Sequence, residues 1–461
     1  MKRSRIKELL AAAQPPESIR VCGWVRTRRD SRDFSFLELN DGSCLENLQI
    51  VADAGIPGYE HIKNITTGAA LAVSGRMQPS PGEKQNWELH AGEICLLGKA
   101  PENYPLQKKR HSDEFLRTIA HLRPRTNKYG AAFRIRSELC HAVHRFFRER
   151  GFTCIHTPIL TGLDCEGAGE LFRVTSLDMD SLPQNPGGGV DYGRDFFEKP
   201  ANLTVSGQLE AEMMALALGD VYTFGPAFRA ENSNTSRHMA EFWMVEPEMA
   251  FCDLFEAMDN AEAFIQYTTA WILESCSADL TLFNRFVDKS LLKTLEPVAA
   301  SGFIRIPYKE AVSILAAAEG RFSHPVHFGA DLQTEHERFL AETHFGRPLI
   351  VYDYPRSIKP FYMRVNDDGE TVAAMDLIVP RIGEIIGGSQ REERLDVLES
   401  RMEETGMNKE EYWWYLDSRR YGSVVHSGYG LGFERFLMLL TGIRNIRDVI
   451  AFPRTPGNLE F

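Results

Sequence analysis

The chain has 461 residues, too many for one ordinary domain, and its 43% hydrophobic and 25% charged residues are typical of a globular protein with a substantial core. No apolar run reaches the roughly 20 residues that cross a bilayer, so we expect no membrane partner, no secretory signal and a cytoplasmic location. The net charge of −12 argues against a nucleic-acid partner for the chain as a whole, and eight scattered cysteines without a C-x-x-C pair argue against a zinc or redox centre.

The charge is distributed unevenly along the chain. Residues 1–130 contain 20 Lys and Arg against 15 Asp and Glu, a net of +5, and the remainder carries a net of −17. A basic N-terminal third on an acidic body favours contact between that end and a polyanion. Mild asymmetry of this kind also arises by chance, so the motifs must decide the matter.

The first hundred residues predict a small β-barrel. Short alternating runs are separated by turn residues such as Asp41-Gly42. The runs cover residues 20–26, 34–39, 48–51, 70–75, 87–90 and 93–97. Five or so strands in about eighty residues favour a barrel of the oligonucleotide-binding type, which we place in a domain of residues 1–100.

The rest of the chain predicts a hinge and an α+β domain. Residues 101–130 contain basic clusters and are interpreted as a hinge with some helix, which either touches phosphates or only links two domains. Residues 131–461 mix helical and strand periods, with a turn-rich stretch at about 178–200 that looks inserted. The predicted helices cover 133–151, 209–218 and 254–276, and the predicted strands cover 153–158, 221–224 and 242–248.

The familiar phosphate-binding loops are missing from the sequence, which has neither G-x-x-x-x-G-K-[ST] nor a strand-linked G-x-G-x-x-G. A nucleotide enzyme of this kind must neutralise phosphate with arginines and metal-bound carboxylates. Residues 228–242 predict a strand, a polar loop and a strand, with Arg229 at the end of the first strand. Residues 430–435 lead through glycines into an apolar helix that Arg435 begins. A lone arginine is usually a surface residue, but two arginines in such contexts favour a phosphate-binding site.

These segments resemble the class II aminoacyl-tRNA synthetases, whose three signature motifs occur here in order. Residues 133–158 resemble the first motif, 228–248 the second and 430–435 the third, and the resemblance extends from about residue 19 to residue 461. The barrel ahead of this core marks the aspartyl/asparaginyl/lysyl subgroup. The stretches that resemble its asparaginyl members are 203–209, 241–248, 358–364 and 387–394.

The resemblance implies a fold, an activity and partners. It implies an antiparallel-sheet catalytic domain with flanking helices, and a homodimer formed through the first motif. L-asparagine would react with ATP to asparaginyl-adenylate and pyrophosphate, and asparagine would then pass to the 3′ end of tRNA(Asn). Because the α-carboxylate of asparagine is already ionised at pH 7, catalysis needs no general base and can rest on positioning and charge neutralisation.

The resemblance also implies roles for individual residues on ATP. Arg229 would bind the α-phosphate and the attacking carboxylate, and Arg435 would hold the γ-phosphate. Asp376 and Glu384 would hold Mg²⁺ on the phosphates, with Glu384 counted among the catalytic residues, since oxygen ligands suit that hard ion. Without the family, these two carboxylates would be read as solvated strand ends. The remaining contacts with the nucleotide fall to Glu231, His238 and Phe242, of which the last would stack on adenine.

The amino-acid pocket distinguishes asparagine from aspartate. Aspartyl enzymes carry a lysine three residues after the glutamine of S-P-Q-x-x-K, where this sequence has Ala211. Glu246 replaces an aspartate of the second motif, and would accept from the amide of asparagine and repel aspartate. Arg391 would donate to the side-chain carbonyl, while Glu166 and Gln208 would bind the α-ammonium. Since an unpaired buried charge is costly, these changes favour the neutral amide.

In the barrel, cations lie beside aromatic residues, as in proteins that read single-stranded bases by stacking and edge hydrogen bonds. By resemblance, Phe36 stacks on an anticodon base, and Arg29 and Gln49 contact a uridine of the anticodon. The competing interpretation makes Phe36 an ordinary core residue.

Three alternatives remain open on the sequence. The nearest is an aspartyl-tRNA synthetase, possibly one that accepts both amino acids, which Ala211 and Glu246 argue against. An ATP-dependent asparagine synthetase on the same core is a second, although such enzymes lack the barrel. The third is a non-catalytic tRNA-binding or single-strand-binding protein, which the presence of Arg229, Arg435 and the two metal carboxylates argues against.

Overall fold

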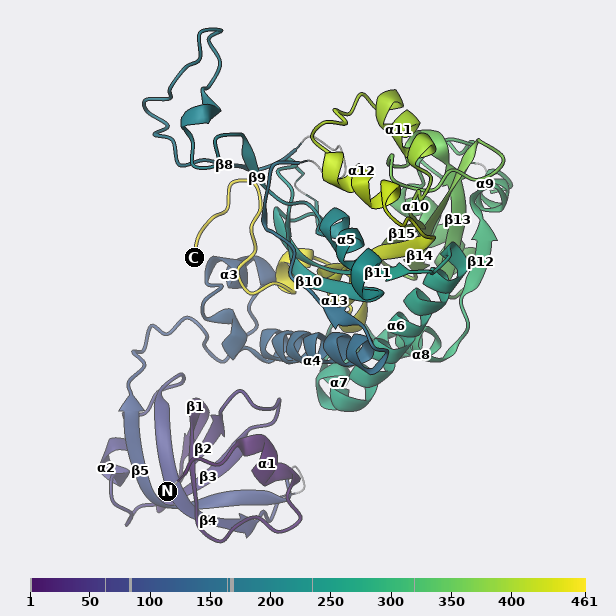
Figure 1. Cartoon of the computed structure of the whole chain (residues 1–461). Helices are drawn as coiled ribbons and strands as arrows, with labels where there is room; N and C mark the ends of the chain where they lie inside the picture. Colours follow the sequence, from purple (N-terminus) through teal and green to yellow (C-terminus); the bar gives the residue numbers. More distant parts are fainter. Residues whose placement is uncertain are drawn as a thin grey trace. The chain divides into compact units, whose positions relative to one another are not determined.

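The computed structural model describes residues 2–62, 64–82, 85–163, 165, 170–233, 235–318 and 320–461. The chain divides into two compact units, Met1–Arg134 and Ile135–Phe461 (Figure 1). None of the helices in the described ranges has the length and apolarity that crossing a membrane requires. All eight cysteines are free thiols.

The N-terminal unit is built on a closed barrel of five strands in the order β1-β2-β3-β5-β4. The strands are β1 (Ile19–Asp30), β2 (Phe34–Asn40), β3 (Leu48–Asp53), β4 (Ala70–Pro79) and β5 (Trp87–Gly98). The short helices are α1 (Ile6–Ala11) and α2 (Tyr59–Ile62). Neighbouring strands are antiparallel except β3 and β5, which are parallel. The barrel predicted from alternation is therefore confirmed, and the two runs predicted at 87–97 form one continuous strand.

The barrel interior is filled by the inward half of each alternating strand. Leu37, Leu39 and Ile50 are fully buried there, and Ile6 of α1 joins the same core. Fully burying an aliphatic side chain contributes about 1.5–3 kcal/mol, so the alternation is itself the main stabilising pattern. The opposite side chains of β2 and β3 face outward.

The predicted hinge contains ordered helical segments. They are α3 (Asp113–Thr118), the 3₁₀ turn η1 (Arg123–Arg125) and the start of α4 (Asn127–Glu149). Ser112 caps α3 by accepting from the backbone N–H of Phe115 at 3.2 Å. Arg26 of β1 donates to the carbonyl of Arg125 and to the side chain of Asn127, which ties this segment to the barrel.

The C-terminal unit is built on an eight-stranded sheet in the order β12-β13-β14-β15-β16-β11-β10-β6. The strands are β6 (Thr153–Cys154), β10 (Asp220–Phe228), β11 (Glu241–Ala250), β12 (Ile304–Pro307), β13 (Leu349–Pro355), β14 (Thr371–Val379), β15 (Gly383–Gln390) and β16 (His426–Gly432). Only the outermost pairs, β6 with β10 and β12 with β13, are parallel. The α+β fold with an antiparallel-rich sheet is thus confirmed.

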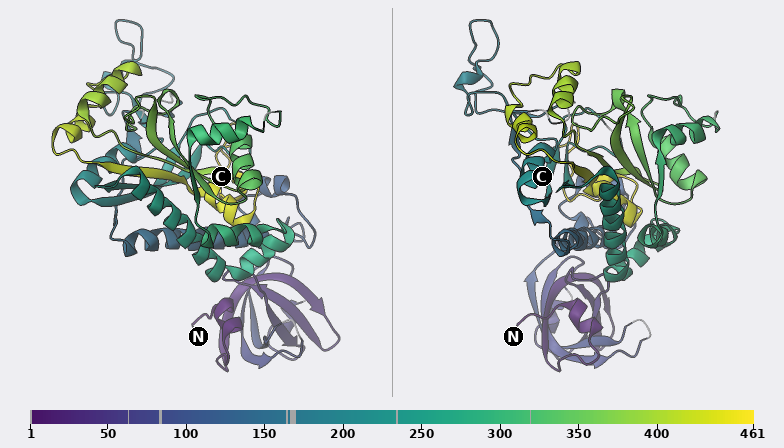
Figure 2. Two further views of the ribbon diagram at one scale, coloured as in Figure 1. Left: turned by 90° about the vertical axis from the view of Figure 1, so that its right-hand side faces the viewer. Right: turned by 45° about the vertical axis from the view of Figure 1, so that its right-hand side comes forward.

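Helices surround this sheet (Figure 2). They are α5 (Gln208–Leu218), α6 (Leu254–Ser275), α7 (Ser277–Phe286), α8 (Leu291–Ala300), α9 (Tyr308–Ala316), α10 (Thr334–Arg338), α11 (Leu395–Glu404), α12 (Trp413–Arg420) and α13 (Phe433–Thr441). Shorter turns are η2 (Tyr192–Arg194), the π-helical η3 (Phe339–His344), η4 (Arg356–Ile358) and η5 (Ile446–Asp448). Helix α5 packs on β10 and β11, and α6 packs on β14, β15 and β16.

The segment after α4 is less regular than the sequence predicts. The predicted strand at 153–158 is wrong beyond Cys154, because β6 pairs with β10 only at Thr153 and Cys154. Pro158 lacks the N–H that a longer ladder would need. A small sheet follows, in the order β7-β9-β8, made of β7 (Leu160–Thr161), β8 (Arg173–Val174) and β9 (Ala201–Leu203).

The turn-rich stretch at 178–200 forms an excursion between β8 and β9 that projects from the C-terminal unit (Figures 1 and 2). Asp195 closes its base by accepting from the hydroxyls of Thr175 and Ser176 at 2.6 and 2.8 Å. Those hydrogen bonds, together with backbone donors, lower the pKa of Asp195 below its usual value. The tip of the excursion is held by local turns.

Candidate active site and anticodon-binding face

Alternate glycines of β16 create the floor of a site in the large sheet. A Cβ on Gly428 would overlap the carboxylate of Glu248, and one on Gly430 would lie 2.8 Å from the Met244 methyl carbon. Strand β11 is paired with β16, so its side chains lean over this bare backbone. The Gly-Tyr-Gly-Leu-Gly run is therefore a strand that makes room for its neighbour, and not a phosphate-binding loop.

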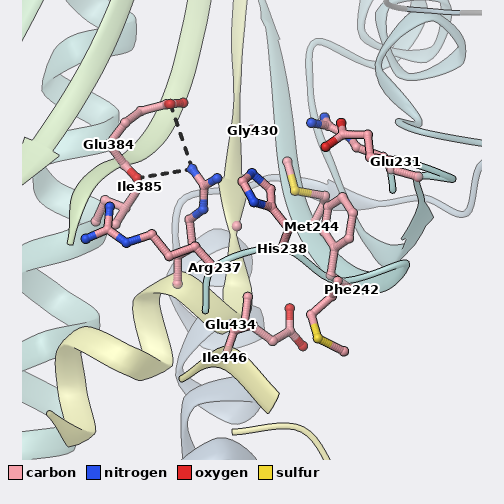
Figure 3. A pocket seen from close by; sticks show the side chains of 14 residues that line it. Glu231, Arg237, His238, Phe242, Met244, Glu384, Ile385, Gly430, Glu434 and Ile446 are labelled. Atoms are coloured by element: carbon pink, nitrogen blue, oxygen red, sulfur yellow. Dashed lines mark hydrogen bonds and ion pairs between the residues drawn. The ribbon is translucent and has the colours of Figure 1, made fainter. Parts of the chain in front are cut away.

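A pocket of about 190 Å³ opens over this floor (Figure 3). It is lined by Arg229, Glu231, Arg237, His238, Met239, Phe242, Met244, Glu384, Ile385, Gly430, Gly432, Glu434, Arg435 and Ile446. Six of the seven side chains assigned to ATP from the resemblance are among them, although they come from three distant parts of the chain. The seventh, Asp376, lies on β14 next to the strand of Glu384.

Two of these side chains, Arg229 and Phe242, lie against each other in the pocket lining. Arg229 follows β10, and its backbone N–H donates to the carbonyl of Ala240 at 3.0 Å. Its guanidinium carbon lies 5.5 Å from the centroid of the Phe242 ring. This cation–aromatic contact places a fixed positive charge beside a flat apolar face, which suits a nucleotide's phosphate and base.

The surroundings of His238 favour the neutral form of its imidazole. Its Nδ1 lies 3.0 Å from the hydroxyl of Ser233 and 2.6 Å from that of Thr235. Burial and the nearby Arg435 lower the pKa of His238, with Glu231 acting in the opposite direction. A neutral imidazole that accepts at Nδ1 carries its proton on Nε2, so it offers a donor.

The two proposed metal carboxylates lie within a wider group of charges. Asp376 accepts from the ammonium of Lys359 at 2.9 and 3.1 Å, and a carboxylate oxygen of Glu384 lies 3.8 Å from Arg435. Burial and Asp376 raise the pKa of Glu384, while Arg435 and Lys359 act to lower it. Glu337 of α10 accepts from the backbone N–H of Glu384 at 3.1 Å. Burial and the other two carboxylates raise the pKa of Glu337 to about 8.

Glu246, which the resemblance assigns to the amino acid, is buried on β11. Its carboxylate accepts from the hydroxyl of Ser206, from the backbone N–H of Gly207 at 3.1 Å and from the hydroxyl of Thr223 at 3.2 Å. A carboxylate offers about four acceptor positions, so these three donors leave room for one further N–H.

Arg391 is only 2% exposed and is neutralised by the protein itself. Its guanidinium donates to both carboxylate oxygens of Glu248, and to the Ser389 hydroxyl at 2.8 Å. Three of its five N–H groups are thereby used and two are left for a ligand. Because the carboxyl groups of Glu248 and Glu212 already face this guanidinium, a neutral carbonyl suits the remaining donors better than a further carboxylate does.

Gln208, the first residue of α5, is buried beside this pair. Its side-chain nitrogen donates to the carboxylate of Glu212 at 3.0 Å. Glu166, the other residue predicted to bind the α-ammonium, lies outside the residues that the structure describes.

In the N-terminal unit, Arg29, Phe36 and Gln49 share the outer surface of the barrel. Arg29 pairs with Phe36 across β1 and β2, and Gln49 pairs with Glu38 across β3 and β2. Phe36 is half-buried and packs edge-to-face on Phe34, with 5.0 Å between ring centroids. The next residue along the strand, Leu37, fills the barrel core instead, so Phe36 lies on the outer side of β2. The amide of Gln49 donates to Glu88 at 3.1 Å.

Comparison with known proteins agrees with this arrangement. Residues 112–456 match the family model of class II tRNA synthetases (D, K and N), and residues 19–97 match that of the OB-fold nucleic acid binding domain. Asparagine–tRNA ligases from Nitratidesulfovibrio vulgaris and a Synechocystis strain are 64% and 58% identical to this chain, with complete coverage of both chains in each comparison.

The chain belongs to the asparagine–tRNA ligases.

Solved structures extend the likeness of this asparagine–tRNA ligase to its whole fold. The asparaginyl-tRNA synthetase from Pyrococcus horikoshii, in complex with asparaginyl-adenylate, is similar with a TM-score of 0.86 and 32% identity. The match covers 100% of this chain and 99% of that one. The aspartyl alternative is not favoured.

The structure of this asparagine–tRNA ligase adds residues to which the sequence assigned no role. Lys359 lies in a stretch noted for its resemblance, but nothing local pairs it with Asp376. Glu248 lies in the second motif, where its partner Arg391 is 143 residues away. For Glu337 and Glu212 the sequence carried no signal, because neither lies in a recognised motif or a distinctive spacing.

Proposed function

We propose that this asparagine–tRNA ligase activates L-asparagine with ATP and then transfers it to the 3′ end of tRNA(Asn). The observation that carries the proposal is the presence of two groups of side chains on one sheet. One is the pocket lined by Arg229, Arg435 and Phe242, and the other is a buried group in which Glu246 and Arg391 are each held by protein partners. Pyrophosphate exchange measured in parallel with asparagine and with aspartate tests it. Exchange that depends on aspartate and not on asparagine would overturn the choice of amino acid.

In the first step, an oxygen of the asparagine α-carboxylate bonds to the α-phosphorus of ATP, and the bond from that phosphorus to the β-bridging oxygen breaks. Pyrophosphate leaves with the electron pair, so no proton needs to be moved. Arg229 lies beside the Phe242 ring and supplies positive charge where the attacking carboxylate and α-phosphate meet. Arg435, which lines the same pocket, binds the γ-phosphate, and Glu231 and His238 contact the nucleotide.

In the amino-acid pocket, Glu246 accepts from the side-chain amide of asparagine and Arg391 donates to its carbonyl. Gln208, with Glu166, binds the α-ammonium. Support comes from the unused acceptor position on Glu246 and the two unused donors on Arg391.

We assign Mg²⁺ to Asp376 and Glu384, whose oxygens are the ligand type that this ion prefers. Their fit is supported by the raised pKa of Glu384, which burial and Asp376 cause and which a bound cation would relieve. When bound, the ion neutralises charge on the phosphates. Among the described residues no group of three His, Cys, Asp or Glu side chains that could hold a metal ion is present.

Glu384→Ala is expected to lower adenylate formation at low Mg²⁺ and to recover part of it as Mg²⁺ is raised, because one oxygen ligand is lost and occupancy falls. The measurement is the Mg²⁺ dependence of pyrophosphate exchange at saturating ATP and asparagine. Glu335→Ala removes a carboxylate that bonds to His324 instead, and serves as the control. An unchanged Mg²⁺ dependence in Glu384→Ala would place the ion elsewhere.

We propose the barrel, residues 1–100, as the anticodon-binding domain, residues 101–130 as a basic hinge and residues 131–461 as the catalytic domain with its insertion at 178–200. The proposal includes a cytoplasmic homodimer that associates through the first motif. The outward placement of Arg29, Phe36 and Gln49 on one barrel face supports their assignment to anticodon bases.

Phe36→Ala is expected to remove a base stack worth about 1–3 kcal/mol, and so to lower kcat/KM for tRNA in aminoacylation roughly 5- to 150-fold. Adenylate formation without tRNA should stay near normal, because that chemistry lies in the other domain. Leu97→Ala removes an exposed apolar side chain of β5 and serves as the control. Equal losses in both steps, or a lower melting temperature of the barrel, would remove Phe36 from the recognition surface.

A further inference from the structure

A buried carboxylate, Glu212, contacts Gln208 and lies near Arg391, two residues proposed to bind the amino acid. It lies one helical turn after Gln208 on α5 and is fully buried. One of its oxygens accepts from the Gln208 side-chain nitrogen at 3.0 Å and lies 3.9 Å from Nε of Arg391. Glu212 is therefore close to Gln208 and Arg391, two residues with proposed roles in binding. No step of the activation chemistry uses Glu212 itself.

The other oxygen of Glu212 is held by groups from distant parts of the chain. The hydroxyl of Tyr415 and the guanidinium of Arg419 each donate to it at 2.7 Å, and Nε2 of His426 lies 3.3 Å away. These partners come from α12 and β16, so the carboxylate is clamped from two directions. Its position is determined without any help from Gln208.

Glu212 is ionised in this setting. Burial would raise the pKa of Glu212, but the charge of Arg419, the hydrogen bond from His426 and the charge of Arg391 outweigh it, and the pKa is lowered. An ionised carboxylate only accepts hydrogen bonds. Of the two ends of the Gln208 amide, the nitrogen must therefore be the one that faces Glu212.

The orientation of this amide matters for the ligand. An α-ammonium only donates hydrogen bonds, so a glutamine can bind it only through its carbonyl oxygen. A freely rotating amide would present its NH₂ group in about half of its orientations, because its two ends are nearly equal in shape. In the observed arrangement the carbonyl oxygen points away from Glu212.

We propose that Glu212 is a positioning residue that holds the Gln208 side-chain amide with its oxygen free for the α-ammonium of the amino acid. The inference rests on the proposed role of Gln208 and adds the reason why its side-chain amide is held in one orientation. Glu212 itself contacts neither substrate.

The test exchanges the two side chains. Glu212→Gln should raise KM for asparagine by about ten-fold or more, the effect of losing a charge-assisted hydrogen bond, and should leave KM for ATP unchanged. Gln208→Glu alone should raise KM for asparagine further than Glu212→Gln does, since two carboxylates then face each other. The double variant Gln208→Glu/Glu212→Gln restores a donor on one side and an acceptor on the other, and should recover at least about three-fold of the loss in Glu212→Gln.

Two further variants separate orientation from stability. Glu212→Asp keeps the charge beside Arg419 but withdraws the carboxylate oxygen from Gln208, so it should also raise KM for asparagine. This variant replaces Glu212→Gln in the test if Glu212→Gln does not fold. Tyr415→Phe removes a hydrogen bond to the other oxygen of Glu212, and should lower the melting temperature while KM for asparagine stays near normal.

A normal KM in folded Glu212→Gln or Glu212→Asp, or a double variant no better than Glu212→Gln, would overturn the inference. Those results leave the proposed function intact as long as the parent protein exchanges pyrophosphate with asparagine. Failure of the parent protein in that assay would instead refute the function itself.

Discussion

Arg229→Ala is expected to slow asparaginyl-adenylate formation by about 100-fold or more, the usual cost of removing a donor that stabilises transition-state charge. The guanidinium lies against Phe242 in the pocket proposed for ATP, where the carboxylate and the α-phosphate, both negative, would approach each other. Without it, their repulsion is uncompensated at the moment when the new bond forms.

Single-turnover adenylate formation and pyrophosphate exchange measure this loss, and the melting temperature shows whether the fold survives. Arg356→Ala is the matched control, because it removes an arginine that pairs with Glu404 at the surface. Near-normal exchange in a folded Arg229→Ala protein would refute the assignment.

Glu246→Gln is expected to lower kcat/KM for asparagine by about 10- to 100-fold and to shrink the preference for asparagine over aspartate. The substitution removes the negative charge that repels aspartate and one of the acceptor oxygens. It need not create a good aspartyl enzyme, because Ala211 still supplies no lysine.

The structure adds a second consequence for this variant. Glu246 accepts from Ser206, Gly207 and Thr223, and a glutamine cannot serve all three donors through a single oxygen. We therefore expect a lower melting temperature as well. The ratio of kcat/KM for the two amino acids separates selection from stability, since loss of stability alone lowers both values equally. A ratio that does not move would show that Glu246 is not the selector.

Much of the fold could be predicted from local pattern. The barrel follows from side-chain alternation, which is a property of neighbouring residues, and the long helices α4 and α6 follow from their apolar period. The irregular path after Cys154 could not be predicted, because the length of an edge strand depends on how far it pairs with its neighbour in the sheet, here β10. The arginines Arg229 and Arg435 could be singled out because each lies at the junction of an element and a distinctive motif.

The arrangement of charges around the pockets was decided only by the tertiary structure. Arg391 and Glu248 are 143 residues apart, and Glu212 and Arg419 are 207 apart. Whether such groups meet depends on strand order and on how α5 and α12 pack, which no local period encodes. The sequence by itself determined which chemical groups this protein carries and in which order. The fold decided which of them neutralise one another, because the free energy of a buried charge depends on its neighbours in space and not on those along the chain.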